Sequence, residues 1–314
     1  MITDGVASVI IPYYNNGQIL ECIDSVLAQD YPSIELIVAD DGSDVDRSAE
    51  LSAYIAANKK ANIVSCSVIR SPENRGTVRN INAGLRKAAG DPIFTLAGDD
   101  VFYDAHVLTD WVAAFRNGNP DVVIGLRSVC DESLAHEFAV SPGKRQAALL
   151  RSGSGKKIWK ELCRENFIFG CATARSAACV EKYGLIPECY KLIEDYPMNL
   201  RWARCGAKIA FLDRIVVRHR KGGGSYALNV SEEYIRDTRM ISDREIIPYV
   251  RQKRFWKRHC EHRIRLRVRE MRYLKLRKRN GSLLWNLLCH LMFPEIILKF
   301  VQTQTYKIRR RLRR

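Results

Sequence analysis

Residues 93–100 read Ile93-Phe94-Thr95-Leu96-Ala97-Gly98-Asp99-Asp100, an apolar run that ends in two adjacent carboxylates. The run predicts a buried strand, and the same pattern of apolar strand and polar break occurs twice earlier. Ala7–Ile11 precedes Pro12-Tyr13-Tyr14-Asn15, and Ile34–Ala39 precedes Asp40-Asp41-Gly42-Ser43. Ligands of open α/β sheets bind outside the carboxyl ends of the strands. The three breaks therefore predict one shared ligand crevice.

Apolar residues at helical spacing separate the predicted strands. Helices are expected over 19–27, 51–55, 78–85 and 107–115, and further strands over 63–69 and 122–126. Strands that alternate with helices favour right-handed crossovers and a mostly parallel sheet with flanking helices. Neither GxGxxG nor GxxxxGK[ST] follows a predicted strand, which argues against a dinucleotide-binding Rossmann domain and against a P-loop.

Composition limits the class of protein. The chain has 314 residues, 46% of them hydrophobic and 27% charged, which suits one large globular domain or two. Its first residues lack a basic segment followed by an apolar one, so we expect no secretion. Ten cysteines occur without any CxxC pair, and this usage predicts reduced, mostly buried thiols in a cytoplasmic protein.

The positive charge of the chain is confined to its C-terminal part. The net charge is +16, and residues 251–314 hold 21 Lys and Arg against 3 Asp and Glu, a net of +18. Residues 1–250 hold the remaining 30 against 32, a net of −2. The basic excess is thus a property of a tail and not of the predicted sheet.

Five motifs stand in a fixed order along residues 7–225. They are Ser8-Val9-Ile10-Ile11-Pro12-Tyr13-Tyr14-Asn15, Val38-Ala39-Asp40-Asp41-Gly42-Ser43, Asn74-Arg75-Gly76 with Arg79-Asn80, Gly98-Asp99-Asp100, and Glu194-Asp195-Tyr196. With these motifs in this order, the chain resembles the family 2 glycosyltransferases of the GT-A fold, in the branch that builds bacterial surface polysaccharides. The resemblance implies a Rossmann-like, mostly parallel α/β sheet in a domain of residues 1–225. Residues 1–125 would bind the nucleotide sugar, and 126–225 would bind the acceptor and carry catalysis.

The resemblance implies transfer of a sugar from a nucleotide-diphosphate donor to an acceptor hydroxyl, with inversion at the anomeric carbon. It assigns Pro12, Tyr14 and Asp40 to the base and ribose of the donor. An aromatic ring can stack on a pyrimidine and a carboxylate can accept its imide N–H, so a uridine nucleotide explains these residues most easily. Tyr14 also suits a core or rim position, and Asp41 and Ser43 suit a turn with a helix N-cap.

The resemblance places Arg79 near the donor diphosphate, for which the forked guanidinium is suited. Arg75 fits a solvated ion pair nearly as well. It assigns Asp100 to direct ligation of Mn²⁺ or Mg²⁺, and Asp99 to the ribose or a metal-bound water.

The metal motif departs from the family pattern, because Ala97 stands where many members carry a carboxylate. With fewer protein ligands, the ion is expected to keep waters and donor phosphates in its coordination shell. His219 resembles the late histidine of the family and fits either a metal or phosphate contact or a hydrogen-bonded structural role.

Asp195 matches the general base of the family, and Glu194 lies on the acceptor side. An inverting displacement needs one carboxylate that takes the proton of the attacking hydroxyl. The alternative for Asp195 is an acid at a helix N-terminus, worth about 0.3–1 kcal/mol of stability. Arg201-Trp202 lacks the preceding Gln of a Gln-x-x-Arg-Trp motif, which disfavours a processive synthase. A non-catalytic nucleotide-sugar or nucleic-acid binding protein is the alternative function.

Residues 226–314 are expected to form a helical, basic, membrane-associating tail. Polar residues interrupt the apolar stretch Leu283–Val301, so it does not predict a membrane span. Basic and aromatic residues beside apolar ones, with the cluster Lys307–Arg314, favour a helix on an anionic membrane surface over an RNA-binding tail or a packed appendage. A glycan or a polyprenyl- or lipid-linked acceptor would fit this peripheral location at the inner face of the cell membrane, and we expect no nucleic-acid partner.

Overall fold

The structure is a computed structural model that describes residues 5–221, 231–279, 282 and 291–292. Strands and helices alternate through its first half, as the apolar spacing predicts. The strands are β1 (Ala7–Tyr13), β2 (Ile34–Asp40), β3 (Ile63–Arg70), β4 (Ile93–Thr95), β5 (Val101–Phe102), β6 (Val122–Cys130), β7 (Glu137–Ser141), β8 (Thr173–Arg175) and β9 (Ile209–Arg220). The helices are α1 (Ile19–Leu27), α2 (Ser48–Asn58), α3 (Thr77–Lys87), α4 (Val107–Arg116), α5 (Lys144–Arg151), α6 (Gly155–Leu162), α7 (Ala177–Tyr183), α8 (Asp195–Arg204), α9 (Glu232–Ile241) and α10 (Lys253–Arg279). Short helical turns are η1 (Gly170–Ala172), η3 (Ser242–Ile246) and η4 (Ile247–Tyr249).

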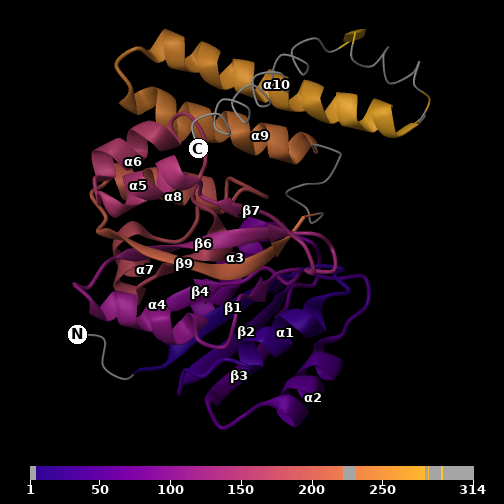
Figure 1. The fold of residues 1–314 in the computed structure, drawn as a ribbon. Coiled ribbons are helices and arrows are strands. Elements are labelled where there is room, and N and C mark those ends of the chain that lie inside the picture. Colours follow the sequence, from indigo (N-terminus) through magenta and orange to yellow (C-terminus); the bar gives the residue numbers. More distant parts are fainter. Residues whose placement is uncertain (1–4, 222–230, 280–281, 283–290, 293–314) are drawn as a thin grey trace, which may run out of the picture.

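The described residues form one nine-stranded sheet in the order β3-β2-β1-β4-β8-β6-β9-β5, with β7 paired to β6 (Figure 1). Strands β3, β2, β1 and β4 are parallel neighbours. Their carboxyl ends therefore meet at one edge, as expected for the crevice.

The second half of the sheet is mixed. Strand β8 runs antiparallel to both β4 and β6, and β5 runs antiparallel to β9, whereas β6 and β9 are parallel. The parallel expectation rested on alternating strands and helices, and that alternation ends near residue 126. Beyond it, β7 follows β6 directly, and pairs of helices separate β7 from β8 and β8 from β9, so the regular alternation of one strand with one helix no longer sets the strand direction.

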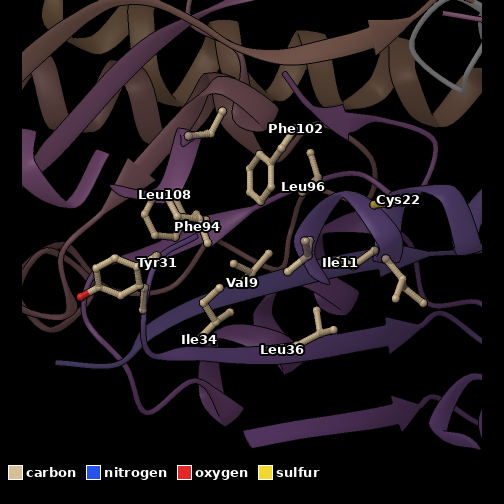
Figure 2. Close-up of a cluster of buried hydrophobic side chains, with 14 of the residues drawn as sticks. Val9, Ile11, Cys22, Tyr31, Ile34, Leu36, Phe94, Leu96, Phe102 and Leu108 are labelled. Atoms are coloured by element: carbon tan, nitrogen blue, oxygen red, sulfur yellow. The ribbon is translucent and has the colours of Figure 1, made fainter. Parts of the chain in front are cut away.

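Alternation along the buried strands divides the core into two layers. Val9 and Ile11 of β1 face one cluster with α1 and α4, whereas Ile10 faces the other cluster with α3. Side chains of a strand point alternately to its two faces, so a strand covered on both sides is apolar throughout. Figure 2 shows the first cluster, in which Val9, Ile11, Leu36 and Phe94 converge from neighbouring strands.

Helices α9 and α10 lie beside each other at the end of the molecule farthest from β3 and α2 (Figure 1). Cys260 of α10 is buried in the second core cluster, and Trp256 packs against it. Within the described part of the chain, no helix combines the length and apolarity that a membrane crossing requires. The segment 222–225, nearly all of Leu283–Val301 and the cluster Lys307–Arg314 lie outside the described residues. The boundary expected at residue 225 stays a prediction.

Asp237 of α9 binds the loop that leads into α8. Its side chain is fully buried, and Oδ2 accepts hydrogen bonds from the backbone N–H groups of Lys191, Leu192 and Ile193 at 2.8, 2.7 and 3.2 Å. The carbonyl of Lys191 in turn accepts from the N–H of Val78 at the start of α3. One carboxylate of the C-terminal segment thus fixes the residues that immediately precede Glu194 and Asp195.

Replacement of this carboxylate should destabilise the whole domain. Asp237→Ala leaves three backbone donors without their acceptor, and we expect a loss of about 3 kcal/mol in the free energy of unfolding. Urea denaturation followed by circular dichroism measures this loss. Asp243→Ala, which removes an exposed carboxylate from the adjoining turn, should cost less than about 0.5 kcal/mol. Equal losses in the two variants would contradict the anchoring role of Asp237.

Candidate active site

The carboxyl end of β1 joins two of the polar breaks. The N–H of Asp41 donates to the carbonyl of Tyr13 at 2.9 Å, and the N–H of Gly98 donates to the carbonyl of Pro12 at 3.0 Å. A Cβ on Gly98 would lie 3.2 Å from the Pro12 carbonyl oxygen, so a side chain there would crowd the β1 backbone. The breaks after β1, β2 and β4 therefore form one continuous edge, as the sequence predicts.

Asp40 is the centre of a hydrogen-bonded turn at this edge. Its Oδ1 accepts from the N–H and the hydroxyl of Ser43 at 2.9 and 2.6 Å, and its Oδ2 accepts from Arg70 Nε at 3.1 Å. A carboxylate has about four lone-pair sites, so Asp40 keeps acceptor capacity for a ligand N–H. The ring of Tyr14 is 43% exposed and lies at the surface, where it is available for stacking. The donor-binding roles of Pro12, Tyr14 and Asp40 stay predictions.

Asp41 holds the loop before α3, in line with the structural reading of this residue. Its two carboxylate oxygens accept from the N–H groups of Arg75 and Gly76 at 2.9 and 2.8 Å. Gly76 has φ +91°, and a Cβ on it would lie 2.6 Å from the Lys191 carbonyl, so only glycine fits. Arg79 follows on the first turn of α3, and its Nε lies 3.4 Å from Oε2 of Glu188. Its predicted contact with the donor diphosphate stays a prediction.

Asp100 and His219 are in direct contact at the other side of the edge. His219 Nδ1 lies 3.0 Å from each oxygen of Asp100, which is fully buried, and the N–H of Arg220 donates to its Oδ1 at 3.0 Å. Burial opposes a charged His219, but hydrogen bonds with Asp100 and Cys171 outweigh it and raise its pKa to about 10. Burial and the neighbouring Asp100 raise the pKa of Asp99. The two carboxylates therefore gain from positive charge placed beside them.

Glu194 and Asp195 lie at the start of α8 and are half-buried. Oδ2 of Asp195 accepts from Asn166 Nδ2 at 3.0 Å and from the N–H of Gly170 at 3.3 Å. Burial raises the pKa of Asp195 although these hydrogen bonds favour its charged form. Burial and repulsion from Asp195 raise the pKa of Glu194. A carboxylate with a raised pKa is a stronger proton acceptor, as a general base requires.

Two buried guanidinium groups flank this acidic pair. Arg127 lies over the ring of Phe169, 3.4 Å from its centroid. Its positive charge offsets part of the rise that burial causes in the pKa of Asp195. Arg175 is 6% exposed and lines a small cavity together with both acids and Trp202. Its positive charge offsets part of the rise in the pKa of Glu194. These cations oppose the protonation of the acidic pair that burial favours.

The turn η1 connects the acidic pair to the Asp100 cluster. Gly170 donates to Asp195, and the next residue, Cys171, places its sulfur among the Asp100 and His219 ligand atoms, all within 4.8 Å of one another. The structure thus brings Asp99, Asp100, His219, Glu194 and Asp195 into one region. Pro12, Tyr14 and Asp40 lie along the same sheet edge.

Sequence reasoning missed Asn166, Gly170 and Cys171. They belong to the irregular segment between β7 and β8, where neither periodicity nor ligand spacing gives a signal. An Asn four residues before a Gly in such a segment resembles an ordinary loop. Only the fold shows that this loop passes beneath the start of α8.

The donor atoms at Asp100, Cys171 and His219 fit a divalent cation. A carboxylate oxygen, an imidazole nitrogen and a thiol sulfur are the ligand types that transition metals use in proteins. Within the described residues, this is the group of three such side chains close enough to hold one ion.

Comparison with known proteins gives the chain its family. The model of Glycosyl transferase family 2 matches residues 8–176. An uncharacterized glycosyltransferase of Rickettsia prowazekii is 28% identical over 234 residues, which cover 72% of this chain and 68% of the relative.

Two solved structures share the fold. One is Staphylococcus aureus TarS 1-349 in complex with UDP-GlcNAc, with a TM-score of 0.57, 19% identity and coverage of 87% of this chain and 74% of that chain. The other is the mannosyltransferase PcManGT from Pyrobaculum calidifontis in complex with GDP-Man and Mn²⁺, with a TM-score of 0.60, 18% identity and coverage of 96% and 83%. With a family match over more than half of its length, the chain belongs to glycosyl transferase family 2 and is a glycosyltransferase of the GT-A fold.

Proposed function

We propose that the protein transfers a sugar from a UDP-sugar to a hydroxyl of a glycan or lipid-linked acceptor, with inversion, in the synthesis of a surface polysaccharide such as an O-antigen, a capsule or a lipopolysaccharide. One observation carries the proposal: the turn η1 links the half-buried acidic pair to the Asp100 and His219 cluster. Its residue Gly170 binds Asp195, and the sulfur of the next residue, Cys171, lies among the ligand atoms of the cluster. A proton acceptor close to a cation site is what this displacement needs.

A uridine nucleotide is supported by the edge formed by β1 and β2. The exposed Tyr14 ring offers a stacking surface, and Asp40 retains acceptor capacity for an imide N–H. TarS was solved with UDP-GlcNAc and PcManGT with GDP-Man, so the fold accommodates different bases. The choice of uridine rests on the residues of this chain.

The chain's own groups divide the work of the reaction. Asp195 takes the proton of the acceptor hydroxyl as its oxygen attacks the anomeric carbon from the face opposite the leaving diphosphate. Asn166 and Gly170 hold the Asp195 carboxylate in place, and Glu194 lies on the acceptor side. Asp100 and His219 would hold Mn²⁺ or Mg²⁺, which would stabilise the charge of the departing nucleotide diphosphate. Asp99 and Arg79 contribute further donor contacts.

The outward face of α10 supports a peripheral membrane location on the cytoplasmic side. Cys260 and Ile264 face inward and are buried, and the opposite side of the helix carries basic residues around exposed Phe255 and Leu266. The exposed residues of this side are Arg254, Phe255, Arg258, His262, Arg265, Leu266, Arg269 and Arg272. Arginines around apolar side chains suit the anionic headgroup region, where each basic residue contributes about 1 kcal/mol.

Loss of the proposed base should abolish turnover without loss of the fold. Asp195→Asn removes the proton acceptor but keeps the shape of the side chain, so we expect turnover to fall at least about a hundredfold. Calorimetric binding of UDP and the melting temperature should stay close to the wild-type values. Asp213→Asn, an exposed substitution on β9, serves as the matched control and should retain full turnover. Near-normal turnover of Asp195→Asn would remove Asp195 as the base.

The rate should depend on pH through this carboxylate. Asp195 acts when deprotonated, and burial raises its pKa, so kcat/KM should fall on acidification at a higher pH than the ordinary carboxyl range of about 4. Asn166→Ala removes a hydrogen bond to the charged form and should move the acidic limb upward by at least about half a pH unit. Asn58→Ala on α2 should leave the limb in place. An unchanged or lowered limb in Asn166→Ala would contradict the assignment.

Membrane binding should depend on the outward face of α10. Reversal of three exposed arginines, in Arg254→Glu/Arg258→Glu/Arg265→Glu, should weaken co-sedimentation with vesicles of phosphatidylglycerol and phosphatidylcholine at least about tenfold. The matched control reverses three exposed lysines of the opposite end, in Lys59→Glu/Lys60→Glu/Lys87→Glu. Equal partitioning of the two triple variants would refute a specific role for α10.

A further inference from the structure

Cys171 occupies a position that the expected metal site does not explain. Its sulfur and the ligand atoms of Asp100 and His219 lie within 4.8 Å of one another, although the three residues come from separate parts of the chain. Asp100 precedes β5, Cys171 belongs to η1, and His219 is near the end of β9. The three potential ligands converge from three elements, and Asp100 and His219 are buried. Such an arrangement is typical of a metal site that the fold forms, and not of side chains that meet by chance at the surface.

The surroundings of Cys171 hold its sulfur in place. η1 packs against β4, β6 and β9. A hydrogen bond holds each end of the turn: the N–H of Gly170 donates to the Asp195 carboxylate, and the N–H of Ala172 donates to the Phe169 carbonyl. The Thr173 hydroxyl donates to the same carbonyl at 2.9 Å. Cys171 therefore has little backbone freedom to move away from Asp100 and His219.

We propose that Cys171 is a third protein ligand of the divalent cation, as a thiolate beside the Asp100 carboxylate and the His219 imidazole. One proton from the Cys171 thiol and one from the protonated His219 ring pass to solvent when the metal bonds form. The inference rests on the proposed function for the role of the ion, but the metal site itself is testable without turnover. It also accounts for Ala97, because the carboxylate missing there is replaced by a ligand from a different element.

A thiolate changes which ions the site prefers. Mg²⁺ and Mn²⁺ favour oxygen ligands, whereas Zn²⁺, Co²⁺ and Cd²⁺ form stronger bonds to sulfur. One oxygen, one nitrogen and one sulfur leave coordination positions for the phosphate oxygens of a donor or for water. We therefore expect Zn²⁺ to displace Mn²⁺ from this protein, and removal of the sulfur to weaken that preference.

Cobalt substitution reads the metal–sulfur bond directly. The purified full chain, treated with chelator and then loaded with Co²⁺, should show the near-ultraviolet sulfur-to-cobalt charge-transfer band. Cys171→Ser and Asp100→Asn should lose the band, and Cys130→Ser, which removes another buried thiol near this end of the sheet, should keep it. In competition titrations, Cys171→Ser should lower the affinity for Zn²⁺ at least about tenfold while changing that for Mn²⁺ less. A band that persists in Cys171→Ser, or is missing from the wild type, overturns the proposal.

Thiol protection gives a second measurement on the wild-type chain, in case Cys171→Ser fails to fold. Alkylation of each cysteine by iodoacetamide is measured by peptide mass spectrometry. Zn²⁺ should slow the alkylation of Cys171 and should not slow that of the exposed Cys205. Equal rates at Cys171 with and without Zn²⁺ contradict ligation. Sugar transfer with Mn²⁺ is assayed in parallel: a cobalt–sulfur band without transfer refutes the proposed function alone, and transfer without the band refutes the thiolate ligand alone.

Discussion

The register of β1 against its two neighbours is the constraint on which the rest of the site depends. The last carbonyls of β1, at Pro12 and Tyr13, accept one N–H from the break after β4 and one from the break after β2. A slip of one residue would exchange the two faces of β1 and turn Ile10 toward the wrong layer. Two hydrogen bonds at one strand end therefore hold the breaks after β2 and β4 side by side.

Several acidic side chains lie at the site, and different partners compensate the negative charge of three of them. Arg70 pairs with Asp40, His219 and the N–H of Arg220 with Asp100, and Asn166 with Asp195. Burial still raises the pKa values of Asp99, Glu194 and Asp195. Burial makes uncompensated charge costly, so these are the positions where a bound cation or a transferred proton changes the energy most. The electrostatics thus agree with a reaction that moves a proton at one end and a diphosphate charge at the other.

The fold of the first 125 residues follows from the sequence because strands buried on both faces are apolar throughout and amphipathic helices have a regular period. The polar breaks at Pro12, Asp40 and Asp99 were predictable for the same reason, since each ends such a strand. The remainder depends on contacts between residues far apart in the chain. Cys171 lies in an irregular loop and approaches Asp100 and His219 from there. Strand β8, which is only three residues long, runs antiparallel to its neighbours in the sheet. No local pattern encodes either feature.

The anchoring of the 191–193 loop by Asp237 has a consequence for the order in which the protein matures. A ribosome releases the chain from its N-terminus, and domains fold as their residues emerge. The sheet that carries Asp40 and Asp100 is complete once β9 has emerged, but the loop before Asp195 has its carboxylate anchor only after α9 follows. The nascent chain therefore passes through a stage in which the sheet is formed and the loop before Asp195 is still loose. This loop becomes anchored only about forty residues after Asp195 has been translated, counted from Asp195 to Asp237.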